Sequence, residues 1–251
     1  MKRIIVAVFI AAVASAHAGL VASLDDIELW AGDGKIATNR AALVIQWNIN
    51  ATSYSFAWGY GWNAGTPTGR DMLLAVDAAE TRLSIDFHAG QNTIFGAFLD
   101  MNGNASSYTP GTPGVVDYGN AANTIHDVAG SVSDPADLYV AGWADGFWSY
   151  EISGGTFEYF DYYSSMNVTF NAPSSQTYAG ANWQTSPVGD LGRELSNGSW
   201  DRFNYSTDLV DYTSPAAIQP LASVPEPSTA ALLILWAIAV TFYAQKRLHS
   251  C

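Results

Sequence analysis

Ala42-Leu-Val-Ile-Gln-Trp-Asn-Ile49 and Tyr54-Ser-Phe-Ala-Trp58 are the two neighbouring segments that decide the fold predicted by the sequence. Both are rich in β-branched and aromatic residues, and in the second the aromatic residues alternate with small ones. This pattern is typical of a strand with one buried face. Similar segments occupy 82–87, 93–98, 138–143, 147–152, 157–163 and 166–170. The sequence therefore predicts a mainly β domain that is antiparallel and sandwich-like.

One segment has helical rather than strand spacing. Thr68 is followed three residues later by Asp71, a variant of the capping box that begins many helices. A stripe of apolar side chains continues at helical spacing, with Met72, Leu73, Val76 and Ala79. We therefore expect one amphipathic helix at about 69–80. Gly- and Asn-rich stretches predict loops at 102–124 and 171–190, and 206–223 is predicted to be a linker.

The charge of the central part of the chain excludes some partners. Between Gly19 and Val224 there are six basic residues against 22 acidic ones, a net charge of −16. Such a surface repels nucleic acid and anionic lipid headgroups, which bind to Lys/Arg patches. It is compatible with divalent cations and with neutral polysaccharide. The single cysteine, Cys251, excludes an internal disulfide, and the length of the central part indicates one domain that buries its own core.

The C-terminal 28 residues have the pattern of a sorting segment. Val224-Pro225-Glu226-Pro227-Ser228 is followed by the uncharged stretch 229–244 and then by Lys246-Arg247. As a helix, the 16 residues of that stretch span about 24 Å, less than the roughly 30 Å of a bilayer core, so the span would need flanking residues or local thinning of the bilayer. We expect a single transmembrane helix there, with the basic pair as its cytoplasmic flank. The two prolines keep the preceding chain extended and accessible to an enzyme. The alternative is a permanent tail anchor.

The N-terminus has the features of a signal peptide. Lys2-Arg3 is followed by an apolar stretch at 4–13 and by the small-residue site Ala16-His17-Ala18. The expected cleavage leaves Gly19 as the first residue, with a second site two residues earlier. The expected organisation is a signal peptide at 1–18, an extracytoplasmic domain at 19–205, a linker at 206–223 and a sorting segment at 224–251.

The order of Pro225-Glu226-Pro227, the apolar stretch and the basic pair resembles the PEP-CTERM signal of Gram-negative bacteria. The resemblance implies that signal peptidase removes residues 1–18 and that an exosortase-type transpeptidase acts at the Pro-Glu-Pro motif. The precursor would be held transiently in the inner membrane, and the product would reach the cell surface or the extracellular matrix. Hosts of this family typically make extracellular polysaccharide, so the resemblance also implies a biofilm setting. It brings no known activity with it.

Aromatic residues beside glycines are the most distinctive chemistry of the domain. Trp58-Gly-Tyr60-Gly-Trp62 and the segment containing Trp143 and Trp148 place large rings next to residues that permit tight turns. One hypothesis is a platform on which these five rings stack against sugars. The alternative is that the rings fill the core of a domain with few leucines.

Metal-binding and catalytic motifs are weak. Asp100, Asn102 and Asn104 resemble the start of a calcium loop, but Ala105 and Gly111 stand where such a loop has glycine and glutamate. A plain Asn-Gly turn explains the same residues, and no other cofactor is expected. Catalytic motifs with a nucleophilic Ser, a zinc-binding His pair or a phosphate loop are absent from the sequence. Two carboxylate pairs remain as candidates for a glycosidase: Glu151 with Glu158, and Asp145 with Asp161.

The sequence therefore predicts an exported, non-enzymatic surface or matrix protein, adhesive or weakly polysaccharide-binding. The alternatives are a secreted glycan hydrolase and a tail-anchored periplasmic ligand-binding receptor.

Overall fold

The computed structural model describes residues 19–49, 52–87, 93–102, 107–110, 129–142, 146–161, 164–187, 189–207 and 219–223. Strands predominate among them, and one helix is longer than a single turn, which confirms the mainly β fold with one helix. The predicted signal peptide and sorting segment lie outside the described residues. Among those residues, no helix has the length and apolar character needed to cross a bilayer.

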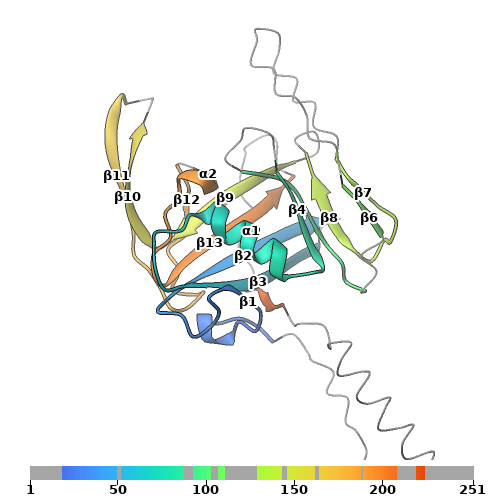
Figure 1. The fold of residues 1–251 in the computed structure, drawn as a ribbon. Helices are drawn as coiled ribbons and strands as arrows, with labels where there is room; N and C mark the ends of the chain where they lie inside the picture. Colours follow the sequence, from blue (N-terminus) through green and yellow to red (C-terminus); the bar gives the residue numbers. More distant parts are fainter. Residues whose placement is uncertain are drawn as a thin grey trace, which may run out of the picture.

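Seven strands form the largest sheet (Figure 1). β2 (Asn39–Ile49) and β3 (Thr52–Trp62), which contain the two segments predicted to be strands, pair as an antiparallel hairpin. β13 (Ser199–Ser206) lies parallel to β2 and antiparallel to β9 (Phe147–Ser153). β1 (Trp30–Gly32) and β14 (Leu221–Ala222) run parallel to β3, and β12 (Gln184–Thr185) runs antiparallel to β9. The sheet is therefore mixed rather than antiparallel, because strands far apart in the chain need no tight turn between them.

The glycines of Trp58-Gly-Tyr-Gly-Trp62 do not form turns, since all five residues continue β3. A Cβ on Gly59 would lie 2.3 Å from the Trp30 ring, and one on Gly61 would lie 2.0 Å from the carbonyl oxygen of Gly34. These glycines let the Trp30–Gly34 segment pack directly on the strand. The expectation of tight turns here was wrong for that reason.

α1 (Gly69–Ala79) begins at the predicted capping box. The Thr68 hydroxyl accepts a hydrogen bond from the Asp71 backbone N–H (3.2 Å), and the Asp71 carboxylate accepts one from the Thr68 backbone N–H (2.8 Å). Met72, Leu73 and Val76 are buried as predicted, whereas Ala79, at the last position of the helix, is exposed.

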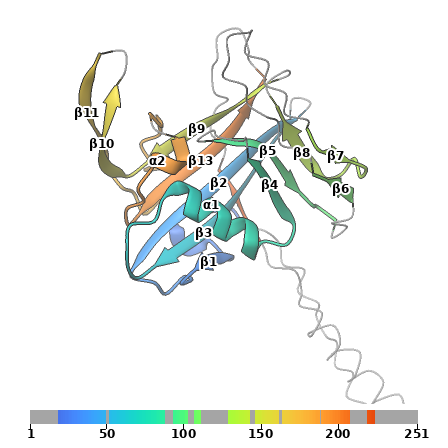
Figure 2. The same cartoon turned by 45° about the horizontal axis from the view of Figure 1, so that its top comes forward.

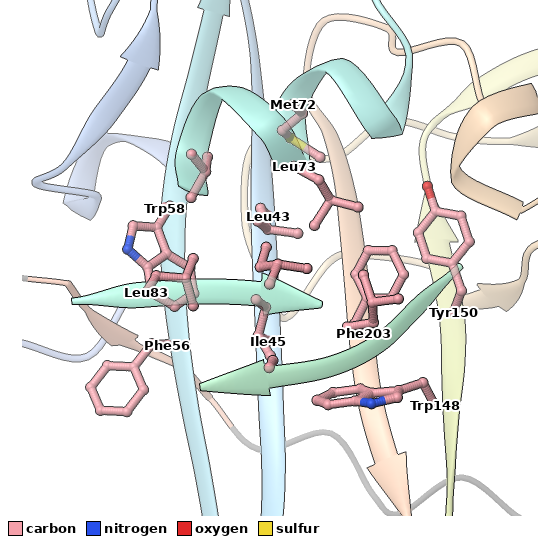
Figure 3. Close-up of a cluster of buried hydrophobic side chains, with 14 of the residues drawn as sticks. Leu43, Ile45, Phe56, Trp58, Met72, Leu73, Leu83, Trp148, Tyr150 and Phe203 are labelled. Carbon is pink, nitrogen blue, oxygen red and sulfur yellow. The ribbon is translucent and has the colours of Figure 1, made fainter. Parts of the chain in front are cut away.

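α1 shares one face of the large sheet with a second, three-stranded antiparallel sheet. Its strands are β4 (Leu83–Phe87), β5 (Ile94–Leu99) and β8 (Leu138–Ala141). Figure 3 shows α1 and the crossing strands of this sheet above Leu43, Ile45 and Phe203 of the large sheet. The indole N–H of Trp47 donates to the Ala97 carbonyl (2.9 Å), and that of Trp148 donates to the Phe95 carbonyl (3.1 Å). Two sheets therefore face each other here, and the helix completes the layer. We call the face of the large sheet that is covered by α1 and the second sheet the helix-side face.

The opposite face carries a smaller core at one end. η1 (Leu24–Asp26) covers it, and the side chains of Val21, Ile27, Tyr178 and Trp200 pack there with Ala42, Val44 and Ala57. β14 also belongs to this region, so the end of the predicted 206–223 linker is part of the sheet. The composition of the 206–223 segment did not predict that its end belongs to the sheet, because a strand of only two residues is enough for the pairing with β3.

Two further strand pairs have no backbone ladder with either sheet. β6 (Tyr108–Thr109) pairs with β7 (Ser131–Val132), and β10 (Gly155–Asp161) pairs with β11 (Met166–Ala172). Figures 1 and 2 show the β10–β11 hairpin projecting from the domain, with β11 as the outer strand in both views. The predicted loop at 171–190 contains β12 and the start of the single-turn α2 (Gly189–Gly192).

Candidate functional site

The predicted aromatic platform is not on the surface. Trp58, Trp62 and Trp148 are all less than 10 % exposed, and Tyr60 is partly buried against Trp62, with the ring centroids 5.8 Å apart. Strand alternation directs these rings into the core of the helix-side face, where the Trp58 indole N–H donates to Glu80 (3.2 Å). Trp143 lies outside the described residues. The burial of Trp58, Trp62 and Trp148 contradicts the platform hypothesis for these three rings and agrees with the core-filling alternative, whereas Tyr60 stays partly exposed.

The Asp100 segment forms a turn held by its own hydrogen bonds. Asp100 is buried and accepts from the Asn102 backbone N–H (2.8 Å), while Asn102 donates through its side-chain amide to Asp134 (3.2 Å). Asp137 accepts from the Met101 backbone N–H (2.9 Å). Asn104 lies outside the described residues. Within the described part of the chain, no group of three or more His, Cys, Asp or Glu side chains is arranged to hold a metal ion.

The candidate carboxylate pairs are not brought together where they are described. Glu151 lies on β9 of the large sheet and forms an ion pair with Arg202. Glu158 lies exposed on β10 of the separate hairpin, opposite Thr169 of β11. Asp145 lies outside the described residues, so the second pair is not described.

A set of polar side chains crosses the large sheet on the face opposite α1. β-sheet register places Ser55, Gln46, Asn204 and Ser149 in one row over β3, β2, β13 and β9. The adjacent row toward the small core contains Arg202 and Glu151, and the row on the other side contains Ser53 and Asn48. We call these eight residues the polar floor. Its central members are buried, and its edge at Ser53 is exposed.

Hydrogen bonds connect much of the polar floor. The Asn48 amide donates to the Asn204 side-chain oxygen (3.0 Å), and the Asn48 side-chain oxygen accepts from Gln46 (3.2 Å) and Ser53 (2.6 Å). The Ser149 hydroxyl donates to the Asn204 backbone carbonyl (3.1 Å). Such a network fixes the orientation of each amide. Ser55, in contrast, has a buried hydroxyl that finds no hydrogen-bond partner in the part of the chain that the structure describes.

Arg202 is the positively charged group of the polar floor. One terminal nitrogen donates to Glu151, and the guanidinium carbon lies 4.6 Å from the centre of the Trp183 ring. Among the described residues, the Nε and Nη1 atoms are buried without a hydrogen-bond partner, and burial lowers the pKa of Arg202 to about 10. Buried donors without acceptors are rare and costly in proteins. Guanidinium, amide, hydroxyl and indole groups lie on one face of the sheet, which is buried at its centre, exposed at Ser53 and partly exposed at Trp183. Such groups suit an oxygen-rich ligand such as a saccharide.

Sequence reasoning missed this site because it missed β13. The segment Ser199-Trp-Asp-Arg-Phe-Asn-Tyr-Ser206 has two adjacent charged residues at its centre, which obscures the strand pattern. The available signal was its alternation, since Trp200, Arg202 and Asn204 face one way and Asp201, Phe203 and Tyr205 face the other.

A second buried ionic cluster lies across β13, on the helix-side face. Asp201 accepts from the Tyr150 hydroxyl (2.5 Å) and forms an ion pair with Arg193 (3.4 Å). Tyr150 and Asp201 lie beneath Gly69 at the start of α1, and the Gly69 backbone N–H donates to the Arg193 carbonyl (2.8 Å). Burial raises the pKa of Asp201, partly offset by Arg193, and burial also raises the pKa of Tyr150. The neighbouring Arg70 holds Asp190 with two hydrogen bonds. These groups are satisfied by one another, so the cluster positions the helix.

No protein-family model matches this chain, and no curated protein or solved structure is detectably similar to it.

Proposed function

We propose that this protein is an exported, non-enzymatic surface or extracellular-matrix protein, released from its N-terminal signal by signal peptidase and from its C-terminal segment by an exosortase-type enzyme. One observation carries this proposal. The backbone N–H of Ala222 donates to the carbonyl of Gly19 (2.8 Å), and that of Val21 donates to the carbonyl of Pro220 (2.8 Å). The residues just inside both expected processing sites are therefore paired with each other, and cleavage outside them leaves the pairing intact.

Ser223 adds a second anchor next to the expected sorting motif. Its backbone N–H donates to the Ala57 carbonyl (3.3 Å), and its hydroxyl lies between Glu80 and Arg82, accepting from Arg82 (2.7 Å) and donating to Glu80. Pro225 follows only two residues later in the sequence. The anchored Ser223 would keep the C-terminal end of the domain in place while an enzyme acts on the Pro-Glu-Pro motif.

The test is the mass of the protein recovered from its own host. We expect a chain that begins at Gly19 and ends near Pro225, and replacement of Pro225-Glu226-Pro227 by three alanines should leave the precursor in the inner membrane. Ser228→Ala, immediately outside the motif, is the control and should be processed normally. A mature chain that retains Cys251 in the wild type would contradict the proposal and favour a tail-anchored receptor.

Weak polysaccharide binding is the second part of the proposal, and the polar floor supports it. Arg202 offers buried donors that lack acceptors, and Trp183 offers a partly exposed ring beside them. Sugar hydroxyls and ring oxygens can accept from the guanidinium while a sugar C–H face packs on the indole. This hypothesis replaces the platform of Trp58, Trp62 and Trp148.

The chain offers a matched control for the binding test. Trp30 is also partly buried in the smaller core and also lies beneath an arginine, Arg40, at 5.7 Å. We expect Trp183→Ala to weaken binding to the host's extracellular polysaccharide roughly tenfold, while Trp30→Ala retains it. Equal losses in the two variants, or no binding by the folded wild type, would overturn the saccharide hypothesis. Binding that needs calcium would instead favour the Asp100 segment, and turnover of the polysaccharide would favour the hydrolase alternative.

A further inference from the structure

The outer edge of β11 is longer than the edge strands of the other sheets that the structure describes. β12 is two residues long and β1 is three, so neither offers a long template for pairing. At the free edge of β4, the Asp77 carboxylate accepts from the Ile85 backbone N–H (3.0 Å) and so covers that edge. β11 has seven residues in regular register with β10, and within the described residues it pairs with no further strand.

β11 also lacks the residues that protect an edge. Its sequence, Met166-Asn-Val-Thr-Phe-Asn-Ala172, contains no charge, no proline and no glycine, whereas β10 carries Glu158 and Asp161. Natural proteins discourage edge pairing with charges, prolines and bulges. In a chain of net charge −13, a neutral edge is where a second copy meets the least repulsion.

The sequence of β11 is complementary to itself in antiparallel register. If Thr169 is the centre, Thr169 faces Thr169 of the other copy, Val168 faces Phe170, and Asn167 faces Asn171. Thr–Thr and β-branched–aromatic pairs are among the favourable cross-strand pairs. Val168 and Phe170 share the face of the hairpin that holds the Phe157–Phe170 stack (4.8 Å), so the apolar side would continue across the junction.

We propose that β11 is a homotypic interface, on which β11 of a second copy of this chain adds antiparallel about Thr169 to form a four-stranded sheet. Phe170 and Ala172 at the base of the hairpin are buried in the main core, whereas the end at Met166 and Asn167 is exposed. A two-stranded hairpin is marginally stable in water, so two further strands would stabilise that exposed end. The twofold arrangement uses the same surface on both copies and closes at the dimer. The exposed side chain of Met166, at the start of the strand, would face Ala172 of the other copy.

Cysteine cross-linking tests the register directly. The full-length chain with Cys251→Ser would carry either Thr169→Cys or, as the matched control, Glu158→Cys, which lies opposite Thr169 on the inner strand. In the proposed sheet the two copies of position 169 are directly opposite each other at about 5 Å, a distance that a disulfide spans. The two copies of position 158 are separated by three strand spacings of about 4.8 Å each, which a disulfide cannot span.

After oxidation with diamide, we expect roughly tenfold more covalent dimer from Thr169→Cys than from Glu158→Cys. Equal yields, or no dimer from either variant, would overturn the proposal. Sedimentation of the Cys251→Ser chain gives an independent readout, because Thr169→Lys should convert dimer to monomer and Glu158→Lys should not. Monomeric behaviour without either lysine would also overturn it. Neither measurement depends on export, processing or saccharide binding.

Discussion

The two faces of the large sheet are built from alternate residues of the same strands, yet they differ in chemistry. On β2, Leu43, Ile45 and Trp47 enter the apolar core beneath α1 and the second sheet, while Gln46 and Asn48 belong to the polar floor on the other side. On β13, Phe203 likewise enters the apolar core, whereas Asn204 belongs to the polar floor. The helix-side face therefore contributes most of the stability, and the polar floor holds buried polar groups that stability alone does not explain.

Truncation on the helix-side face should have the largest effect. Trp58→Ala removes a fully buried ring and the donor to Glu80, and we expect it to lower the free energy of unfolding by about 3–5 kcal/mol. Urea denaturation followed by circular dichroism measures the change. Trp58→Phe keeps most of the volume and should cost less. A loss below about 1 kcal/mol for the alanine variant would show that this face is not the main source of stability.

Variants of the Arg202–Glu151 ion pair in the polar floor should lower the free energy of unfolding in a non-additive way. Arg202→Met leaves Glu151 without its partner, and Glu151→Gln leaves the buried guanidinium unpaired, so each single variant should cost about 3 kcal/mol. The double variant should cost less than the sum, because no uncompensated charge remains. Unfolding of the four proteins in urea gives the coupling energy. Additive losses would mean that the pair contributes no interaction of its own.

The Glu80–Arg82–Ser223 contact makes stability depend on pH at the edge of the helix-side face. Burial raises the pKa of Glu80, but hydrogen bonds from Arg82, Ser223 and Trp58 outweigh it and hold the pKa below its ordinary value of 4.5. A lowered pKa in the folded state adds stability that is present above pH 4.5 and is lost as pH falls through the folded value. Glu80→Gln should therefore cost about 1–3 kcal/mol at pH 7, and the difference from wild type should shrink in acid.

Ser223→Ala is the companion variant, since it removes one contact to Glu80 but keeps the charge. It should retain a smaller pH-dependent contribution. A difference between Glu80→Gln and wild type that stays constant from pH 7 to pH 3 would contradict the assignment of this stability to the ionised carboxylate.

The comparison of the faces also explains what could be predicted from sequence. The β2–β3 hairpin and α1 follow from local alternation and from the capping box at Thr68, so their existence was predictable. β13 and β14 were missed because their pairing partners are distant in the chain, and Asp201-Arg202 interrupts the apolar pattern of β13. The prediction of an aromatic platform that contains Trp58, Trp62 and Trp148 was wrong for a related reason. Composition indicates how many rings a chain has, but only register shows which face each ring enters.

Two serines in one row of the polar floor give the smallest and most discriminating prediction. Ser149 donates a hydrogen bond to the Asn204 carbonyl, so Ser149→Ala should lower stability by about 1 kcal/mol. Ser55 lies in the same row with a buried hydroxyl that has no partner, so Ser55→Ala should raise stability by about 0.5–1 kcal/mol. Thermal unfolding of both variants measures the two signs.

A hydroxyl that is kept against stability suggests another use. The Ser55→Ala variant should therefore bind polysaccharide more weakly than wild type even though it is more stable. If Ser55→Ala is less stable than wild type, the Ser55 hydroxyl has a hydrogen-bond partner in solution. The polar floor then differs less from the helix-side face at that position. If it is stabilised and binding is unchanged, the row containing Ser55 is excluded from the ligand site, and only Arg202 and Trp183 remain to support it.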